Sequence, residues 1–485
     1  MRIALHHSLL HSRHRTMAEL AAALAALAGT GPSSTAAAAT PKPLSPAALG
    51  AHSNWFVPPH LLRLPAVRAS AFAAHDCSIE AVNHPQDFDR VYRYGLSLQE
   101  LASKLSAQPA DQLSLLHQAA EVYMEASTLQ GGRHAAALYN WAVALTDIAR
   151  LVRAQQPDEA YECLTAAASK YAQSLAAHPD NPQACNNWGL VLQDLSAMRP
   201  AAERGGYLRH SLSKFRRALR LRPDFDRAVY NLGTVLYSHA CSLQEALLAS
   251  QEAAEAAGTA GTARRGGGSA PGTPLAAAAA AAAGGGGGGE QAASERAIQA
   301  TFAHAAQYIV LAYAMQPGKQ VYADSLAAVQ RLLPLPYLRS GALLAVRPGT
   351  EGSPAEEWVA CWFGLDSQRL AAVRPPAALA AAAAAAASHP AAGSSSAAGA
   401  GQLAAAPLPI QVELADVADA RLAADPSLPA GAALWVSMHS RPSGMYFVAP
   451  DQDDAEGWVD ALLLLSHLLR TGDISGVRAA LAVRR

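Results

Sequence analysis

The sequence predicts a mainly α-helical protein, in which a solenoid of paired helices is followed by a small α+β domain. Along residues 85–334 the same short motif recurs at equivalent places in amphipathic helices. After about residue 335, apolar residues recur with the period of two that is typical of strands. One long amphipathic helix then closes this second region. The N-terminus and several Ala/Gly-rich insertions lack such patterns and are predicted to be disordered.

The recurring motif is an aromatic residue or leucine followed by a small residue within the first helix of each unit. The second helix of a unit carries an aromatic and then a proline, as in Phe215 and Pro223. Paired helices of this kind resemble the tetratricopeptide (TPR) repeat, which has a period of about 34 residues. The small residue lets the two helices approach closely, and a larger one would overpack the contact. The motif is seen four times, as Tyr94-Gly95, Trp141-Ala142, Trp188-Gly189 and Leu232-Gly233.

The predicted organisation has four parts. A disordered tail precedes the solenoid, with one apolar segment, Trp55-Phe56-Val57, that is expected to dock on the first repeat. A helix near the end of the solenoid is expected to cap it. A long insertion within the fourth unit is tolerable because the entropy cost of loop closure grows only logarithmically. The predicted ranges are 1–84 (tail), 85–334 (solenoid, insertion about 250–292), 335–472 (α+β domain, insertion about 375–407) and 473–485 (tail).

Composition argues against several classes of function. The net charge is −1, from 37 basic and 38 acidic residues, so nothing favours nucleic acid. The five cysteines are dispersed without a CxxC motif, which argues against a zinc site or disulfide framework. No HExxH, GxSxG or P-loop motif occurs. We therefore expect a non-enzymatic protein without a cofactor.

The solenoid offers two rows of polar residues for a protein partner. Asn140, Asn187 and Asn231 occupy one position of successive first helices and have the donors and acceptors to hold a peptide backbone. The alternative is that these amides join neighbouring repeats. Farther along the same helices, Glu100, Asp147 and Asp194 form an acidic row. This row predicts a groove that prefers a neutral or basic segment.

A basic strip lies on the second helix of the third unit. Most of its members are expected to face water, since Phe215 and Ala218 face inward. The strip is either an ordinary solvated face or a contact for an acidic polymer such as actin, or for anionic lipid. Its members are Arg209, Lys214, Arg216, Arg217, Arg220 and Arg222.

The C-terminal region resembles the pleckstrin-homology (PH) fold, in which strands are followed by one helix. Trp458 is expected to anchor this helix against a small curved sheet. Phosphate capture needs several basic residues on the first strands. Only Arg339 and Arg347 are present there, followed by acidic residues. A protein-interaction role is therefore expected in place of phosphoinositide binding.

Several segments together resemble a plant family of TPR proteins known as hypersensitive to latrunculin B. They are AVNHPQDFDRVYRYGLSLQELASKL, the repeat block, LPLPYL and GWVDALLLL. The resemblance implies a cytoplasmic adaptor peripheral to the trans-Golgi network or early endosome, linking vesicle traffic to actin. Two other classes stay open. One is a TPR co-chaperone, and the other is an organelle-imported assembly factor, which the Arg/His-rich start of the chain allows.

Overall fold

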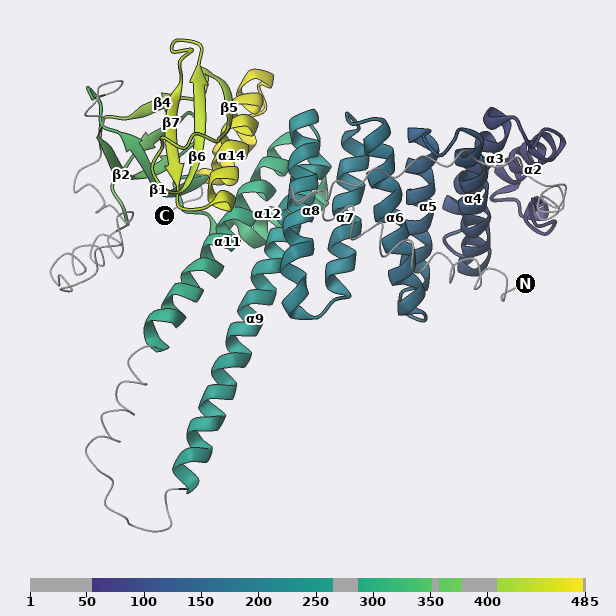
Figure 1. Cartoon of the computed structure of the whole chain (residues 1–485), viewed down its shortest axis with the longest axis horizontal. Helices are drawn as coiled ribbons and strands as arrows, with labels where there is room; N and C mark the ends of the chain where they lie inside the picture. Colours follow the sequence, from purple (N-terminus) through teal and green to yellow (C-terminus); the bar gives the residue numbers. More distant parts are fainter. Residues whose placement is uncertain (1–54, 265–286, 351–356, 377–407, 483–485) are drawn as a thin grey trace, which may run out of the picture. The chain divides into compact units, whose positions relative to one another are not determined.

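The computed structural model of the chain describes residues 55–264, 287–350, 357–376 and 408–482 (Figure 1). The described chain forms two compact units, Met1–Leu221 and Arg222–Arg485. Mainly helical packing and a C-terminal antiparallel sheet confirm the predicted fold class.

The first unit is a stack of antiparallel helix pairs. Helix α2 packs on α3, and the pairs α3–α4, α5–α6 and α7–α8 follow one another. The first helices of successive pairs also contact each other, so that α3, α5 and α7 share one face. We call this the first-helix face. The elements are η2 (Leu61–Arg63), α2 (Arg68–Asn83), α3 (Phe88–Ser103), α4 (Pro109–Leu129), α5 (Ala135–Val152), α6 (Pro157–Ala177), α7 (Pro182–Ala197) and α8 (Ala201–Leu221).

Glycine makes the predicted close approach between the helices of a pair. A Cβ atom added at Gly95 would lie 2.7 Å from the ring of Tyr123, and one at Gly189 would lie 2.7 Å from Phe215. The repeats are nevertheless longer than the nominal TPR. Each second helix, α4, α6 and α8, has 21 residues. In the third unit, α8 begins at Ala201, soon after α7 ends at Ala197.

Order begins earlier than predicted, so the expectation of a disordered tail over 1–84 is wrong for its last part. Helix α2 lies within that range, and Trp55 and Val57 are buried. The Trp55 and Tyr94 rings lie 6.0 Å apart, which confirms that this segment docks on the first repeat. Helix α2 was missed because its buried face consists mainly of alanines, which give little apolar periodicity. Residues 1–54 lie outside the described part of the chain.

The second unit begins with the long helix pair α9–α11. A Cβ at Gly233 of α9 would lie 2.9 Å from Ile309 of α11, so the fourth unit keeps the glycine contact across its insertion. Helices α12 and α15 pack on α11. The helices are α9 (Asp226–Arg264), α11 (Gly287–Met315), α12 (Gln320–Val329), α14 (Gln452–Thr471) and α15 (Ser475–Leu481), with the 3-10 turn η3 (Gln330–Leu332) after α12.

Two predicted disordered stretches are helical where the structure describes them. The expected insertion at 250–292 is wrong at both ends, since α9 continues to Arg264 and α11 starts at Gly287. Alanine has the highest helix propensity, and extending an existing helix needs no new nucleus. The expected tail at 473–485 contains α15, whose Gly476 lies against Ala314 of α11. Residues 265–286, 377–407 and 483–485 lie outside the description.

The sheet of the second unit has the order β4-β3-β2-β1-β7-β6-β5, and all neighbours are antiparallel. The turn at 414–416, which separates β4 from β5, carries no glycine or proline to mark it in the sequence. The strands are β1 (Arg339–Val346), β2 (Trp358–Leu365), β3 (Arg369–Ala372), β4 (Gln411–Glu413), β5 (Val417–Ala423), β6 (Ala432–Met438) and β7 (Met445–Ala449).

Helix α14 lies against β5, β6 and β7 (Figure 1). Its Trp458 is fully buried, as expected for the anchor of this helix. Within the sheet, the buried rings of Phe363 on β2 and Phe447 on β7 meet edge to face at 5.4 Å. Helix and sheet therefore share one core.

Candidate interaction surfaces

Asparagines of the first-helix face join neighbouring repeats. Asn140 Nδ2 donates to the Tyr92 hydroxyl at 2.7 Å, and Asn187 Nδ2 donates to the Tyr139 hydroxyl at 3.1 Å. Each bond spans 48 residues, so the same contact is made one repeat apart. The structure thus supports the alternative that these amides connect repeats. They lie together with the tyrosines on α3, α5 and α7.

A similar contact occurs in the second unit. The hydroxyls of Tyr230 on α9 and Ser325 on α12 are hydrogen-bonded at 2.9 Å, and the rings of Tyr230 and Tyr322 stack at 4.5 Å. Helix α12 therefore covers α9 much as one first helix covers the previous one. This is the capping helix that the sequence predicted. Asn231 is half-buried on α9 and belongs to this second unit.

The predicted acidic row is compensated by nearby bases. Glu100 pairs with Lys104 at 2.8 Å, Asp147 with Arg150 at 3.1 Å, and Asp194 with Arg153 at 3.1 Å. All three acids lie on first helices, as expected. Burial raises the pKa of Asp147, and Arg150 opposes that effect. Basic side chains therefore accompany each acid of the row, so its charge gives no reason to expect that this face prefers basic segments.

An apolar row, which was not among the predicted features, lies between the amides and the acids. Leu96, Val143 and Leu190 occupy equivalent positions of α3, α5 and α7. Leu96 is 40% exposed, and the other two are half-buried. The signal was available in the sequence, because each of these residues precedes a member of the acidic row by four positions. Three incompletely buried apolar side chains thus line one strip.

The expectation that the basic strip faces water is wrong for two of its members. Lys214 and Arg216 are buried, with 6% and 4% exposure. Lys214 Nζ lies 4.0 Å from the centre of the Trp188 ring, and burial lowers its pKa. The sequence pattern predicted that Phe215 and its apolar neighbours face inward. A lysine stem can also pack inward on an aromatic face.

The remaining members of the strip differ in their environment. Arg217 donates to the carbonyl of Pro179 at 2.9 Å. Arg222 belongs to the second unit and lies over Phe225 at 4.1 Å. Only Arg209 and Arg220 are exposed. The six residues thus do not form one continuous basic surface.

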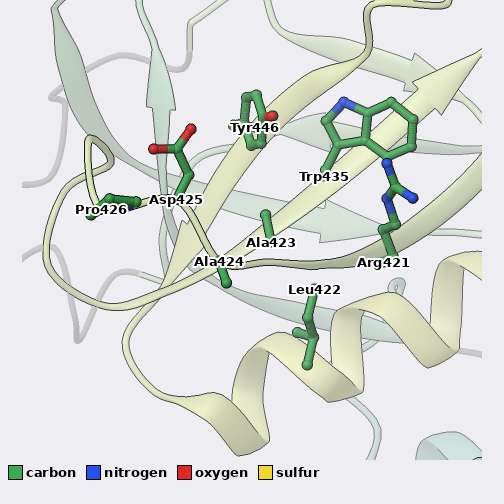
Figure 2. A pocket seen from close by; sticks show the side chains of 8 residues that line it. All are labelled: Arg421, Leu422, Ala423, Ala424, Asp425, Pro426, Trp435 and Tyr446. Atoms are coloured by element: carbon green, nitrogen blue, oxygen red, sulfur yellow. The ribbon is translucent and has the colours of Figure 1, made fainter.

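The sheet of the second unit carries a shallow hollow of about 420 Å³ that sequence reasoning missed (Figure 2). Arg421, Trp435 and Tyr446 stand directly opposite one another on β5, β6 and β7. The guanidinium of Arg421 lies 4.5 Å from the centre of the Trp435 ring. Asp425 and Pro426 border the hollow on its other side. No motif reveals this group, because only the strand register brings its members together.

The first strands provide no free pair of bases for phosphate. Arg339 is 4% exposed and contacts the carboxylate of Asp454. Arg347 is held by both carboxylate oxygens of Glu357, at 2.6 and 3.1 Å. Both arginines are therefore already engaged by carboxylates of the same unit.

Within the described ranges, no group of three or more His, Cys, Asp or Glu residues could hold a metal ion. The same residues include no helix with the length and apolar character that a membrane crossing requires. All five cysteines are unpaired thiols. Comparison with known protein families found no family model that matches this sequence, and a search of curated proteins found no match.

Proposed function

We propose that this protein is a non-enzymatic adaptor that holds an extended segment of a partner protein along its first-helix face. The apolar row Leu96, Val143 and Leu190 carries this proposal. It repeats in register on three neighbouring helices and stays incompletely buried. Exposed apolar residues in register are a feature of interaction surfaces.

The inter-repeat bonds support such a role by fixing the spacing of the helices. Neighbouring helix axes lie about 8–10 Å apart. An extended chain rises about 3.3 Å per residue, so one repeat corresponds to about three residues of a bound segment. We therefore expect a segment with an apolar side chain at about every third residue. Tyr139 and Asn187, held by their mutual bond, keep the surface preorganised.

Site-specific photocrosslinking in cells tests this face. A photoreactive amino acid replaces Leu96, Val143 or Leu190 in turn, and Met124 on α4 serves as the control because it is also apolar and 45% exposed. The same partner should be crosslinked from the three first-helix positions and not from Met124. Equal crosslinking from Met124, or none from the row, contradicts the proposal.

The cellular role we propose is that of an adaptor peripheral to the trans-Golgi network or early endosome, in traffic linked to actin. The resemblance of the repeat block and the GWVDALLLL segment to the latrunculin-B-hypersensitivity family supports it. Imaging of the chain with a free N-terminus should show endosomal puncta. Import into an organelle would instead favour the assembly-factor alternative. The co-chaperone alternative is disfavoured because no row of Lys or Arg recurs along the positions of the first-helix face.

Two side chains of α8 are the remaining candidates for a direct contact with actin. Arg209 and Arg220 are the exposed members of the basic strip. Replacing both with glutamate should reduce co-sedimentation with filaments, and added salt should do the same. Arg470→Glu, an exposed arginine of the other unit, is the matched control. Co-sedimentation that survives the double change places actin association elsewhere.

A further inference from the structure

We infer that the outer edge of the C-terminal sheet is a second docking surface, which binds an extended peptide by adding it as a strand beside β5. The peptide would place one acidic side chain on Arg421 and an apolar side chain in the neighbouring hollow. This surface is separate from the first-helix face of the proposed function.

Strand β5 is the last strand of the sheet, and within the described part of the chain it pairs only with β6. Along an antiparallel edge, alternate residues turn their N–H and C=O groups away from the sheet. Such an edge can accept another strand, in which main-chain bonds provide affinity and side-chain pockets provide specificity. The outward-facing N–H and C=O groups of β5 therefore favour an extended polypeptide as the ligand.

Arg421 supplies the charge for recognition. Its side chain is exposed and is stacked on Trp435 at 4.5 Å. Among the described residues, no carboxylate lies within ion-pair distance of it. Stacking leaves the edge of a planar guanidinium available for two parallel bonds to a carboxylate. This geometry selects a Glu or Asp of the ligand.

The Trp435 ring is itself held in place. Its Nε1 donates to the Ser443 carbonyl at 3.1 Å. A Cβ at Gly444 would lie 2.4 Å from the same nitrogen, and Gly444 has a φ of 70°. The β6–β7 turn therefore fixes the ring on which Arg421 rests, so little ordering is needed on binding.

The residues around the hollow limit how many acidic side chains a bound peptide can carry. Tyr446, 37% exposed, and Pro426 provide apolar surface for one side chain. Asp419 and Asp425 flank Arg421 along the chain, and bonds from Ser427 lower the pKa of Asp425. A second acid beside the first would meet these carboxylates. The preferred ligand thus has a single acid next to an apolar residue.

The test is fluorescence anisotropy of the full chain with labelled, capped hexapeptides of alternating Thr and Val, in which one Thr is replaced by Glu. The expected results are binding of the Glu peptide, weaker binding of its Gln counterpart, and a loss of about tenfold in affinity for Arg421→Gln. Asp425→Asn should relax the selection against a second Glu. Thermal melting of each variant checks that these exposed changes leave the fold intact.

Two further arms address the strand pairing and the ligand class. Methylating the backbone nitrogens on one edge of the peptide should abolish binding, while methylating those on the other edge should not. Equal binding of both isomers, no preference for Glu over Gln, or no binding at all would overturn the inference. So would Arg421-dependent binding to phosphatidylserine vesicles in place of peptide, which would assign the surface to a membrane.

Discussion

At the scale of single residues, the question is whether the asparagines of the first-helix face bind a ligand or connect neighbouring repeats. Asn187 is bonded to Tyr139 across a repeat boundary. A net hydrogen bond of this kind contributes about 1 kcal/mol. Tyr139→Phe and Asn187→Ala should each lower the free energy of unfolding of the free protein by about that amount. A double-mutant cycle should show that the two losses overlap.

Urea denaturation without any partner is the measurement. A residue that serves only a ligand would leave the stability of the free protein unchanged. Gln183→Ala, a nearby polar residue of α7, provides the control for removing a side chain from the same helix. Additive losses from Tyr139→Phe and Asn187→Ala would contradict the inter-repeat role.

Glycine positions provide a second test at the residue scale. A Cβ at Gly189 would lie 2.7 Å from Phe215, so Gly189→Ala should destabilise the chain by about 1–3 kcal/mol through overpacking. Phe215→Leu in the same chain should recover part of this loss. Gly206→Ala is the matched control, because nothing lies within 4 Å of its added Cβ. The higher helix propensity of alanine at position 206 should raise the free energy of unfolding by about 0.5–1 kcal/mol. Thermal melts of the three variants separate these effects, and equal behaviour of Gly189→Ala and Gly206→Ala would contradict the packing account.

At the scale of elements, α14 is tied to the sheet and to α11 by buried polar contacts. Arg339 of β1 donates to Gln307 of α11 at 3.0 Å and contacts the Asp454 carboxylate of α14. Tyr308 of α11 donates to Asp460 at 2.7 Å. Replacing the charge by Asp454→Asn leaves Arg339 buried without its counter-ion. The expected loss is about 3 kcal/mol, at the lower end for a broken buried pair because Asp454 stays partly exposed.

The pH dependence of this loss follows from the pKa of Asp454. Burial alone would raise that pKa, but His304 and Arg339 together hold it below its usual value. A lowered pKa in the folded state means that the carboxylate stabilises the fold above its ordinary pKa of about 3.9, and that this contribution disappears as the pH falls through the lowered value. Urea denaturation of Asp454→Asn against the natural chain should show the full difference at pH 7 and a shrinking one below about pH 4. A difference that is constant down to pH 3 would rule out the ion pair as its cause.

The individual helices also show how much of the fold could be predicted from the sequence. Strong apolar periodicity located α3, α5, α7 and α14, because those helices bury large side chains on one face. It failed for α2 and the far end of α9, where alanine replaces those side chains. Among surface residues, the acids and asparagines were placed on the correct helices. Their partners, Arg153 and Tyr139, and the Arg421–Trp435 stack arise from spatial neighbours that no local spacing encodes.

At the scale of the whole molecule, the boundary of the C-terminal folding unit is testable. Sequence patterning places it near residue 335, whereas the compact unit in the structure begins at Arg222. A fragment of residues 335–485 would lack α11. It would expose the surfaces that receive Gln307 and Tyr308, and leave Asp460 and the Gly457 carbonyl without these donors. Unpaired buried polar groups cost about 1–3 kcal/mol each, a large share of the stability of a small domain.

We therefore expect fragment 222–485 to unfold in one cooperative transition and fragment 335–485 to aggregate or to melt without cooperativity. Circular dichroism melts and limited proteolysis of both purified fragments provide the comparison. Adding residues 294–334, which contain most of α11 together with α12 and η3, to the shorter fragment as a synthetic peptide should restore part of its structure, since Gln307 and Tyr308 lie within that segment. A scrambled peptide of the same composition is the control. A cooperative transition of 335–485 alone, at the same temperature as 222–485, would show that the sheet and α14 need no support from the helix pair.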